Sequence, residues 1–241
     1  MSSARADILN GRRRIAAEAL GTALLVAAVI GSGIMAQRLT GDRAVALLAN
    51  TIATGGALIA ILLSFGPISG AHLNPAVTLC MVALKQQTPR SAVGYIAAQL
   101  VGGIAGAILA NAMFELAPIA WSMTARTGLA QSLSEAVATF GLVGVVIAVG
   151  RTRAAITPFA VAAYIVAAYW FTASTSFANP AVTIARAFSN TFAGIRPGDV
   201  AGFLIAQAIG ASAGALVFSW LVPLGDLTSS HDRDGVQPPR L

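Results

Sequence analysis

The pentapeptide Asn-Pro-Ala-Val-Thr occurs twice in this chain of 241 residues, at positions 74–78 and again at 179–183. Each copy opens a short apolar stretch that is flanked by longer ones. One polar turn repeated inside two hydrophobic halves indicates an inverted-repeat membrane protein, in which two broken helices meet at the middle of the bilayer. The two turns therefore predict where the polar centre of the molecule lies.

The composition is that of a membrane protein. Hydrophobic residues make up 56% of the chain and charged residues only 10%, whereas a soluble domain carries about 25% charged residues. Six apolar stretches have the length of about 20 residues that a spanning helix needs, namely 15–36, 44–64, 91–114, 129–150, 155–174 and 200–222. The chain is therefore predicted to be an all-α membrane protein with six transmembrane helices.

The distribution of basic residues predicts the orientation of the chain. The formal net charge is +6, but with a cytoplasmic N-terminus ten Lys and Arg residues fall on the inner side and five on the outer side. This positive-inside bias accounts for the charge without a nucleic-acid partner. We expect a multi-pass protein of the cell (inner) membrane, surrounded by the lipid bilayer, with both termini cytoplasmic.

The two halves of the chain match beyond the pentapeptide. A Glu-x-x-x-Thr segment begins at Glu18 and again at Glu135, and Ala-Gln-x-x-Gly-x-x-x-Gly recurs at 98–106 and 206–214. Three spans per half is an odd number, so the second half is inverted in the membrane relative to the first. The paired glycines predict close helix packing.

This repeat predicts the organisation of the whole chain. The expected parts are a cytoplasmic N-terminal segment 1–14, a first repeat 15–114 with a re-entrant half-helix 75–85, a connecting loop 115–128, a second repeat 129–222 with a re-entrant half-helix 180–189, and a cytoplasmic tail 223–241.

The repeated turn is predicted to start each half-helix, because Asn is a favoured cap and Pro a favoured first helical residue. The two starts are Asn74, Pro75, Ala76 and Asn179, Pro180, Ala181. Each Asn side-chain oxygen should accept from the backbone N–H of Val77 or Val182, which leaves the amide NH2 free to donate into a lumen.

Both half-helix N-termini are expected to point at the centre, each with about half a positive charge. At about 5 Å and an effective dielectric of about 20, they would oppose a cation by roughly 3 kcal/mol. The sequence therefore predicts a passive channel that passes small neutral hydroxylated solutes and excludes ions and protons.

Backbone before each turn cannot be helical, and at membrane depth such backbone either lines a cavity or is buried. The carbonyl groups expected to line the channel belong to Gly70, Ala71, His72, Ser174, Thr175 and Ser176. The His72 imidazole either forms a polar wall or braces the loop. Glu18 and Glu135 lie inside apolar stretches, where they either carry protons or, as we favour, accept hydrogen bonds from the irregular backbone.

The stretch Ser-Gly-Ala-His-Leu-Asn-Pro-Ala-Val-Thr at 69–78, with the second Asn-Pro-Ala and the paired Glu-x-x-x-Thr segments, resembles the major intrinsic protein family of aquaporins and aquaglyceroporins. The resemblance covers about residues 14–222. It implies an aquaporin-like fold of six spanning helices and two re-entrant half-helices, one pore in each subunit, and a homotetramer.

The resemblance also implies where the selectivity filter lies. Counted from the two asparagines without a gap, its positions are Thr54, Ala167, Ser176 and Val182. Typical members of the family carry an arginine at the position of Val182, so four small or medium uncharged residues imply a wider opening than in water-selective or glycerol-selective members. By analogy with bacterial members that lack this arginine, the expected solutes are arsenite as neutral As(OH)3, glycerol and water.

Two side chains near the half-helices have open roles. Arg186 lies four residues beyond Val182 and shares its helix face, so it is either a charge in the vestibule or an arginine at the headgroup level or a subunit contact. Cys80 either faces the lumen or, as we favour, packs in the interior.

Other functions remain as alternatives. A water-selective aquaporin would have a narrower filter, and a secondary transporter would need ligands for a coupling ion near the midplane. A purely structural membrane protein would show no solute flux. An enzyme has no support, since we find no nucleophile–base set, metal-ligand spacing or cofactor motif in the sequence.

Overall fold

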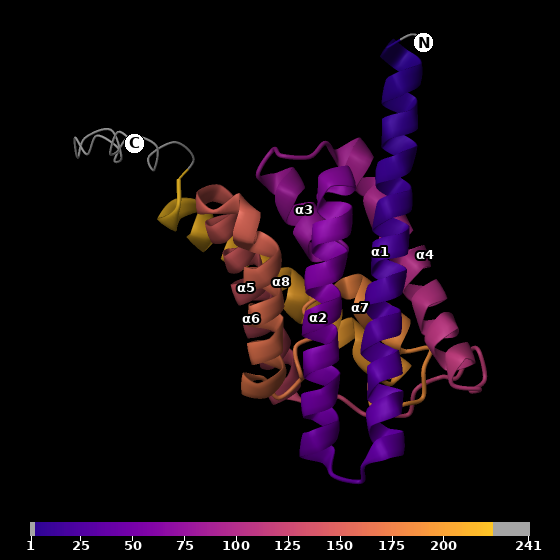
Figure 1. The fold of residues 1–241 in the computed structure, drawn as a ribbon. Coiled ribbons are helices and arrows are strands. Elements are labelled where there is room, and N and C mark those ends of the chain that lie inside the picture. Colours follow the sequence, from indigo (N-terminus) through magenta and orange to yellow (C-terminus); the bar gives the residue numbers. More distant parts are fainter. Residues whose placement is uncertain (1–2, 224–241) are drawn as a thin grey trace, which may run out of the picture.

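The computed structural model describes the backbone of residues 3–223 and the side chains of residues 10–223. Within this range the chain is helical, and Figure 1 shows the helices packed side by side. The elements are α1 (Ser3–Leu39), α2 (Arg43–Ser69), α3 (Pro75–Ala83), α4 (Pro89–Met113), α5 (Leu129–Thr152), the 3-10 turn η1 (Ala154–Ile156), α6 (Thr157–Phe171), α7 (Pro180–Arg186) and α8 (Pro197–Leu221). The predicted tail 223–241 lies outside the described residues, apart from Pro223.

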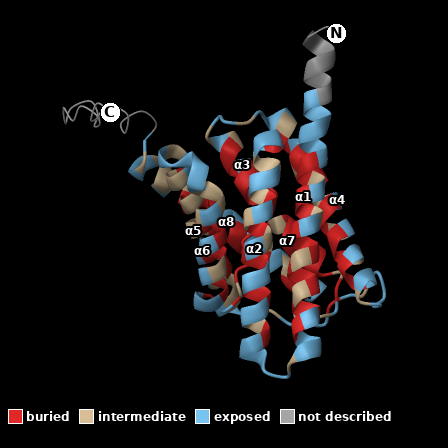
Figure 2. Cartoon of the chain, viewed as in Figure 1, coloured by how far each residue is buried: buried red, intermediate tan, exposed pale blue. Residues whose placement is uncertain are grey.

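Six helices in the described range are long and apolar enough to cross a bilayer, which confirms the predicted all-α membrane fold. They are α1, α2, α4, α5, the segment formed by η1 and α6, and α8. Their outward faces expose large apolar side chains such as Leu20, Val101 and Leu216, while the faces turned toward one another are buried (Figure 2). In water such a surface would be unfavourable, whereas lipid tails are as apolar as these side chains.

The two repeats pack in the same way. Helix α1 contacts α4 and α2, and helix α5 contacts α8 and α6. A β-carbon at Gly102 or Gly106 would overlap the backbone of α1, and one at Gly210 would overlap the backbone of α5. These glycines therefore let the helix backbones approach closely, as the repeated Gly-x-x-x-Gly pattern predicts.

The half-helices α3 and α7 lie between the long helices. They contact each other, and each packs against a helix of the other repeat, α3 on α8 and α7 on α4. Helix α3 lies in the half of the molecule nearer the N-terminus and α7 in the opposite half (Figure 1). Each repeat thus supplies part of the support for the other's half-helix.

Both half-helices are shorter than the sequence suggested. Helix α3 ends at Ala83 rather than residue 85, because the chain turns into a left-handed conformation at Lys85 with φ 59°. Helix α7 ends at Arg186 rather than residue 189, where the N–H groups of Ala187 and Phe188 bond three residues back and close the helix in a tighter turn.

The connecting loop occupies residues 114–128, one residue more than predicted, and folds back onto the chain that follows α7. The Ala120 N–H donates to the Phe188 carbonyl at 3.1 Å, and the Ser122 N–H donates to the Ala187 carbonyl at 2.9 Å. This contact joins the loop between the repeats to the second half-helix.

We predict that Gly102→Ala destabilises the protein, because the added methyl group would push α4 away from the Ala19 carbonyl of α1. Overpacking of this kind costs about 1–3 kcal/mol. Thermal unfolding of the purified protein in detergent measures the effect. The matched control is Gly56→Ala, where a β-carbon meets no atom within 4 Å; equal losses in both variants would contradict the close packing.

Candidate functional site

A cavity of about 600 Å³ runs between the two repeats and is lined by residues from both. Asn74 and Asn179 line it where the half-helices begin. At the end away from the N-terminus, hereafter the distal mouth, the wall includes Tyr169 and Arg186, the last residue of α7. The other end is bordered by Gln86 and by Arg151 near the end of α5, among others. A molecule crossing this cavity would pass both asparagines.

The two asparagines hold the opposite loops together. The Asn74 Nδ2 atom donates to the Ala178 carbonyl at 2.8 Å, and the Asn179 Nδ2 atom donates to the Leu73 carbonyl, also at 2.8 Å. Each amide carries two hydrogens, so one is engaged across the repeat interface and the other remains for the cavity. The expectation that the whole NH2 group is free is therefore corrected.

Each asparagine also caps its own half-helix. The Asn74 Oδ1 atom accepts from the Ala76 N–H at 2.9 Å, one residue earlier than Val77. The Asn179 Oδ1 atom accepts from Ala181 at 3.0 Å and from Val182 at 3.3 Å. With the oxygen directed at the backbone, the amide nitrogen turns toward the cavity and the opposite loop.

Strained backbone precedes both asparagines. Leu73 and Ala178 have φ angles of 51° and 48°, and Ala71, Thr175 and Ser176 are also left-handed. Non-glycine residues seldom adopt this conformation, and each instance costs of order 1–3 kcal/mol unless its surroundings enforce it.

Two buried carboxylates enforce it here. Glu18 accepts from the backbone N–H groups of His72 at 3.0 Å and Leu73 at 2.7 Å. Glu135 accepts from those of Phe177 at 2.8 Å and Ala178 at 2.9 Å. Both side chains are fully buried. Hydrogen bonds to a charged acceptor are the strong ones, so the carboxylates act as backbone acceptors rather than as groups exposed to the cavity.

A glutamine completes each carboxylate site. The Gln99 amide donates to Glu18 at 2.8 Å and to the Thr78 hydroxyl at 3.0 Å. Its counterpart Gln207 donates to Glu135 at 2.6 Å and to the Thr183 hydroxyl at 2.8 Å. The last helix of each repeat is thereby tied to its loop and to the threonine that ends the pentapeptide.

His72 both borders the cavity and is braced. Its ring lines the cavity together with Gly70 and Ala71. The Nδ1 atom lies 3.2 Å from the Thr78 hydroxyl, and the ring packs edge-on against Tyr95 with centroids 5.4 Å apart. The two alternatives for this residue are therefore compatible.

Three of the four residues predicted for the selectivity filter line the cavity, namely Thr54, Ser176 and Val182. Ala167 does not: it is exposed on the outside of α6, and Tyr169 takes a place in the wall instead. Residues two apart on a helix point about 200° away from each other. Counting without a gap therefore chose the wrong face of α6. The Tyr169 hydroxyl lies 3.4 Å from the Thr54 hydroxyl.

Ser174 and Thr175 are also absent from the cavity wall, contrary to expectation. The Ser174 carbonyl accepts from Arg126 at 3.0 Å, and the Ser174 hydroxyl accepts from the Ser176 N–H at 3.2 Å. The carbonyl that was expected to face the lumen is therefore bonded within the protein.

Arg186 lies in the wall of the distal mouth. The residue is only 2% exposed and borders the cavity, so it is buried within the subunit and not at the molecular surface. The Nε atom donates to the Ala193 carbonyl, and the guanidinium lies over the Phe177 ring, 3.4 Å from its centroid. Of the two roles considered for this residue, the vestibule charge agrees with its position.

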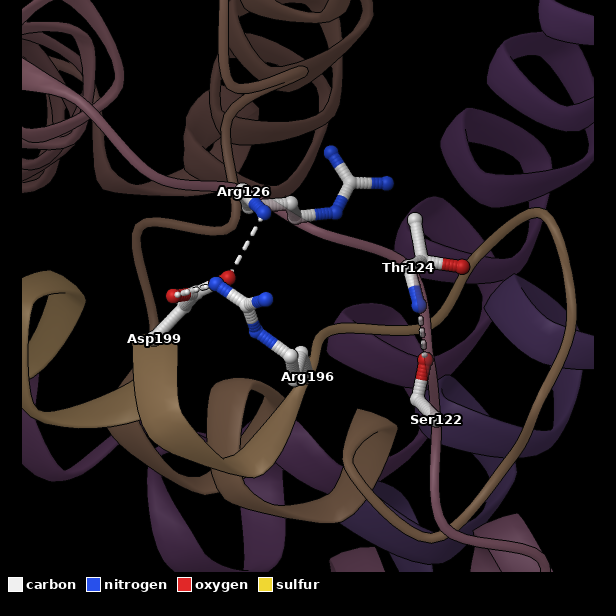
Figure 3. Close-up of polar contacts among 5 residues, drawn as sticks. All are labelled: Ser122, Thr124, Arg126, Arg196 and Asp199. Carbon is white, nitrogen blue, oxygen red and sulfur yellow. Dashed lines mark hydrogen bonds and ion pairs between the residues drawn. The ribbon is translucent and has the colours of Figure 1, made fainter.

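Arg126 of the connecting loop was not predicted as a site residue, yet it holds the distal mouth together. Its three guanidinium nitrogens donate to the carbonyls of Gly194 at 2.8 Å, Ser174 at 3.0 Å and Phe192 at 3.3 Å. Its backbone N–H donates to the Asp199 carboxylate at 2.8 Å (Figure 3). Nothing in the sequence marks a loop arginine whose partners are carbonyl groups far along the chain.

Both arginines are cations in each other's neighbourhood. Burial lowers the pKa of Arg126 to about 10, which still leaves it protonated at neutral pH. Its Cζ atom lies 4.8 Å from the same Phe177 centroid, so the two guanidinium carbons are at most about 8 Å apart. At that distance and a dielectric of about 20, their repulsion is about 2 kcal/mol.

Cys80 packs in the interior of the protein, in a cluster with Val143 and Ile147 of α5 and Ala211 of α8. It is buried beside Ala76 and Met81 and is not among the residues that line the cavity.

Comparison with known proteins gives consistent matches. The family model described as major intrinsic protein matches residues 6–172. Aquaglyceroporin AqpS of Rhizobium meliloti (strain 1021) is 56% identical over 210 residues, which cover 87% of this chain and 90% of that protein. Aquaporin NIP6-1 of Arabidopsis thaliana is 36% identical over 144 residues, 59% of this chain and 47% of that protein. The X-ray structure of the aquaglyceroporin from Plasmodium falciparum has the same fold, with a TM-score of 0.65, 19% identity and coverage of 92% and 99% of the two chains.

The assignment of Tyr169 to the wall predicts a sharp difference between two neighbouring substitutions. Tyr169→Trp enlarges a side chain that borders the cavity and should lower glycerol permeability at least about threefold. Ala167→Trp enlarges one on the outside of α6 and should leave it unchanged. Stopped-flow light scattering of proteoliposomes measures both. A loss in Ala167→Trp with none in Tyr169→Trp would restore the ungapped assignment.

Proposed function

The chain belongs to the major intrinsic protein family and is a passive transmembrane channel for small neutral solutes, and from this premise we propose that its filter admits solutes larger than water, with arsenite as As(OH)3 and glycerol as the favoured classes. The observation that carries the proposal is the wall at the level of Val182. Thr54, Tyr169 and Ser176 line the cavity with Val182, and none of the four is charged.

The position of the nearest guanidinium supports this proposal. Arg186 follows Val182 by one helical turn, and its guanidinium lies over the Phe177 ring, so the cation comes from a residue beyond Val182 and not from position 182 itself. An arginine at Val182 would fill part of the cross-section. With a valine there, the cavity keeps room for a solute with several hydroxyl groups.

The wall supplies partners for such a solute along its path. Hydroxyl groups of Thr54 and Tyr169 can donate or accept at the distal mouth, and the remaining amide hydrogens of Asn74 and Asn179 can donate at the centre. Beyond the centre, the backbone at Gly70 and its neighbours offers acceptors. Because these groups replace water around a neutral hydroxylated solute, it can shed its hydration shell without a large penalty.

The same centre opposes cations. The two half-helices begin at Asn74 and Asn179 and meet there, and each N-terminus carries about half a positive charge. A cation must also lose water that the mostly apolar wall does not replace. The charge of the N-termini and the loss of water do not depend on the width of the filter. A wider filter therefore admits larger neutral solutes without admitting cations.

We further propose a homotetramer in the cell (inner) membrane with both termini cytoplasmic. Membership of the family supports one pore in each subunit and the tetramer. The similarity to a bacterial aquaglyceroporin supports the inner membrane, and the excess of Lys and Arg on the side of the N-terminus supports the orientation. In this orientation the distal mouth is the outer one.

Comparison of solutes tests the filter proposal. Proteoliposomes containing the full chain should swell with water, glycerol, urea and arsenite at rates above those of empty liposomes, measured by light scattering and, for arsenite, by uptake. Water permeability alone, with no increase for the other three solutes, would refute the proposal. Accumulation of any solute against its gradient would point to a transporter.

We predict that Val182→Arg lowers glycerol and arsenite permeability about tenfold or more and lowers water permeability less, because a long cationic side chain would narrow the filter. A tenfold change corresponds to about 1.4 kcal/mol. Val182→Leu is the control for size, since it adds bulk without charge or donors. Equal reduction of water and glycerol by Val182→Arg would contradict a role in discrimination.

A further inference from the structure

Two guanidinium groups converge at the distal mouth without a carboxylate partner. Arg186 and Arg126 lie over the same Phe177 ring, from α7 and from the connecting loop respectively. Like charges this close in the interior are unfavourable unless an opposite charge compensates them. The partners of each arginine therefore decide what the mouth can bind.

The acids near the mouth are engaged elsewhere. Among residues 10–223 the one ion pair joins Arg196 to Asp199, at 3.0 Å. The second Asp199 oxygen accepts from the backbone N–H of Arg126 rather than from its guanidinium (Figure 3). Glu135 is bonded to two backbone N–H groups and to Gln207. Neither converging guanidinium is hydrogen-bonded to an acid, and the two cations outnumber the one carboxylate, Glu135, whose charge acts on both of them, so the mouth keeps an excess of positive charge.

The two arginines differ in how many of their guanidinium nitrogens donate to protein carbonyl groups. All three guanidinium nitrogens of Arg126 are bonded to carbonyl groups, which fixes this side chain as a positioning residue. Arg186 donates to the Ala193 carbonyl through Nε alone. Within the described part of the chain, its two terminal nitrogens have no protein acceptor. Arg186 is only 2% exposed and borders the cavity. Its two terminal nitrogens are therefore directed into the distal mouth.

A small anion matches these donors. The planar fork of a guanidinium binds oxyanions through two parallel hydrogen bonds and also attracts halides. The hydroxyl groups of Tyr169 and Thr54 border the same cavity and offer further donors. Next along the wall comes the uncharged Val182, so an anion that moves inward loses its hydrogen bonds to the guanidinium before it reaches other donors.

We propose that the distal mouth binds a small monovalent inorganic anion, such as nitrate or chloride, on the free guanidinium nitrogens of Arg186, and that the bound anion obstructs the passage of neutral solutes. The field of Arg126 strengthens this binding. The obstruction rests on the proposed function, because it is defined by the slowing of solute flux. The binding of the anion does not depend on the proposed function.

Flux in two salts tests the obstruction. Glycerol permeability of proteoliposomes is measured with sodium nitrate or sodium lactobionate outside at equal ionic strength, lactobionate being too bulky for the mouth. At the nitrate concentration that half-saturates the site, permeability should fall about twofold, because an occupied pore conducts nothing. Arg186→Met should abolish the difference between the salts. Arg43→Met, which removes an exposed arginine at the start of α2, should retain it.

Thermal unfolding in detergent tests the binding separately. Nitrate should raise the Tm of the wild type and of Arg43→Met relative to lactobionate, and it should not raise that of Arg186→Met. A nitrate effect that persists in Arg186→Met, or equal effects of the two salts, would overturn the anion site. Absence of glycerol flux from the wild type in both salts would instead refute the proposed function, and the Tm titration would still decide the binding.

Discussion

The structure depends on two buried carboxylates that hold irregular backbone in place. Glu18 and Glu135 each accept two backbone N–H groups from the residues just before an Asn-Pro-Ala turn. Those residues include Leu73 and Ala178, whose left-handed conformation is costly for side chains with a β-carbon. Non-helical backbone at membrane depth must find every hydrogen bond inside the protein. A charged acceptor in the first helix of each repeat meets that requirement. It also fixes the loop that orients the asparagine side chain.

The cavity chemistry follows from this constraint. Once each loop is fixed, its asparagine caps the following half-helix and reaches the carbonyl of the opposite loop, so the two repeats are joined at the centre by a reciprocal pair of hydrogen bonds. The half-helices then present their N-termini to each other, with one amide hydrogen per asparagine left for a solute. The proposed filter lies further out, where Val182 and Tyr169 contribute no charge to the wall and Arg186 follows Val182 by one helical turn. The family model matches residues 6–172, which include Tyr169 but end before Val182 and Arg186.

Much of this could be predicted from the sequence, because the deciding residues repeat. Six apolar stretches identified the spans, the two pentapeptides identified the half-helix starts, and the paired acids were expected to be backbone acceptors. Tyr169 was missed because the number of irregular residues between α6 and Asn179 cannot be counted from the chain, and an error of two positions selects the opposite helix face. The cross-loop use of the asparagine amides was missed because a carbonyl acceptor has no sequence signature. Arg126 was not predicted for the same reason, because its acceptors at Ser174, Phe192 and Gly194 are backbone groups of distant segments.

The role of the buried carboxylates is tested most directly by the solute permeability and Tm of Glu135→Gln, with the exposed Glu115→Gln as the control. An amide at position 135 turns a donor toward the N–H groups of Phe177 or Ala178 or toward Gln207, and losing a hydrogen bond to a charged group costs about 1.5–3 kcal/mol. We predict a lower Tm and a loss of glycerol permeability in Glu135→Gln, with both quantities unchanged in Glu115→Gln. Wild-type Tm and permeability in Glu135→Gln would contradict it, because the loop before the second asparagine would then be held by something other than this carboxylate.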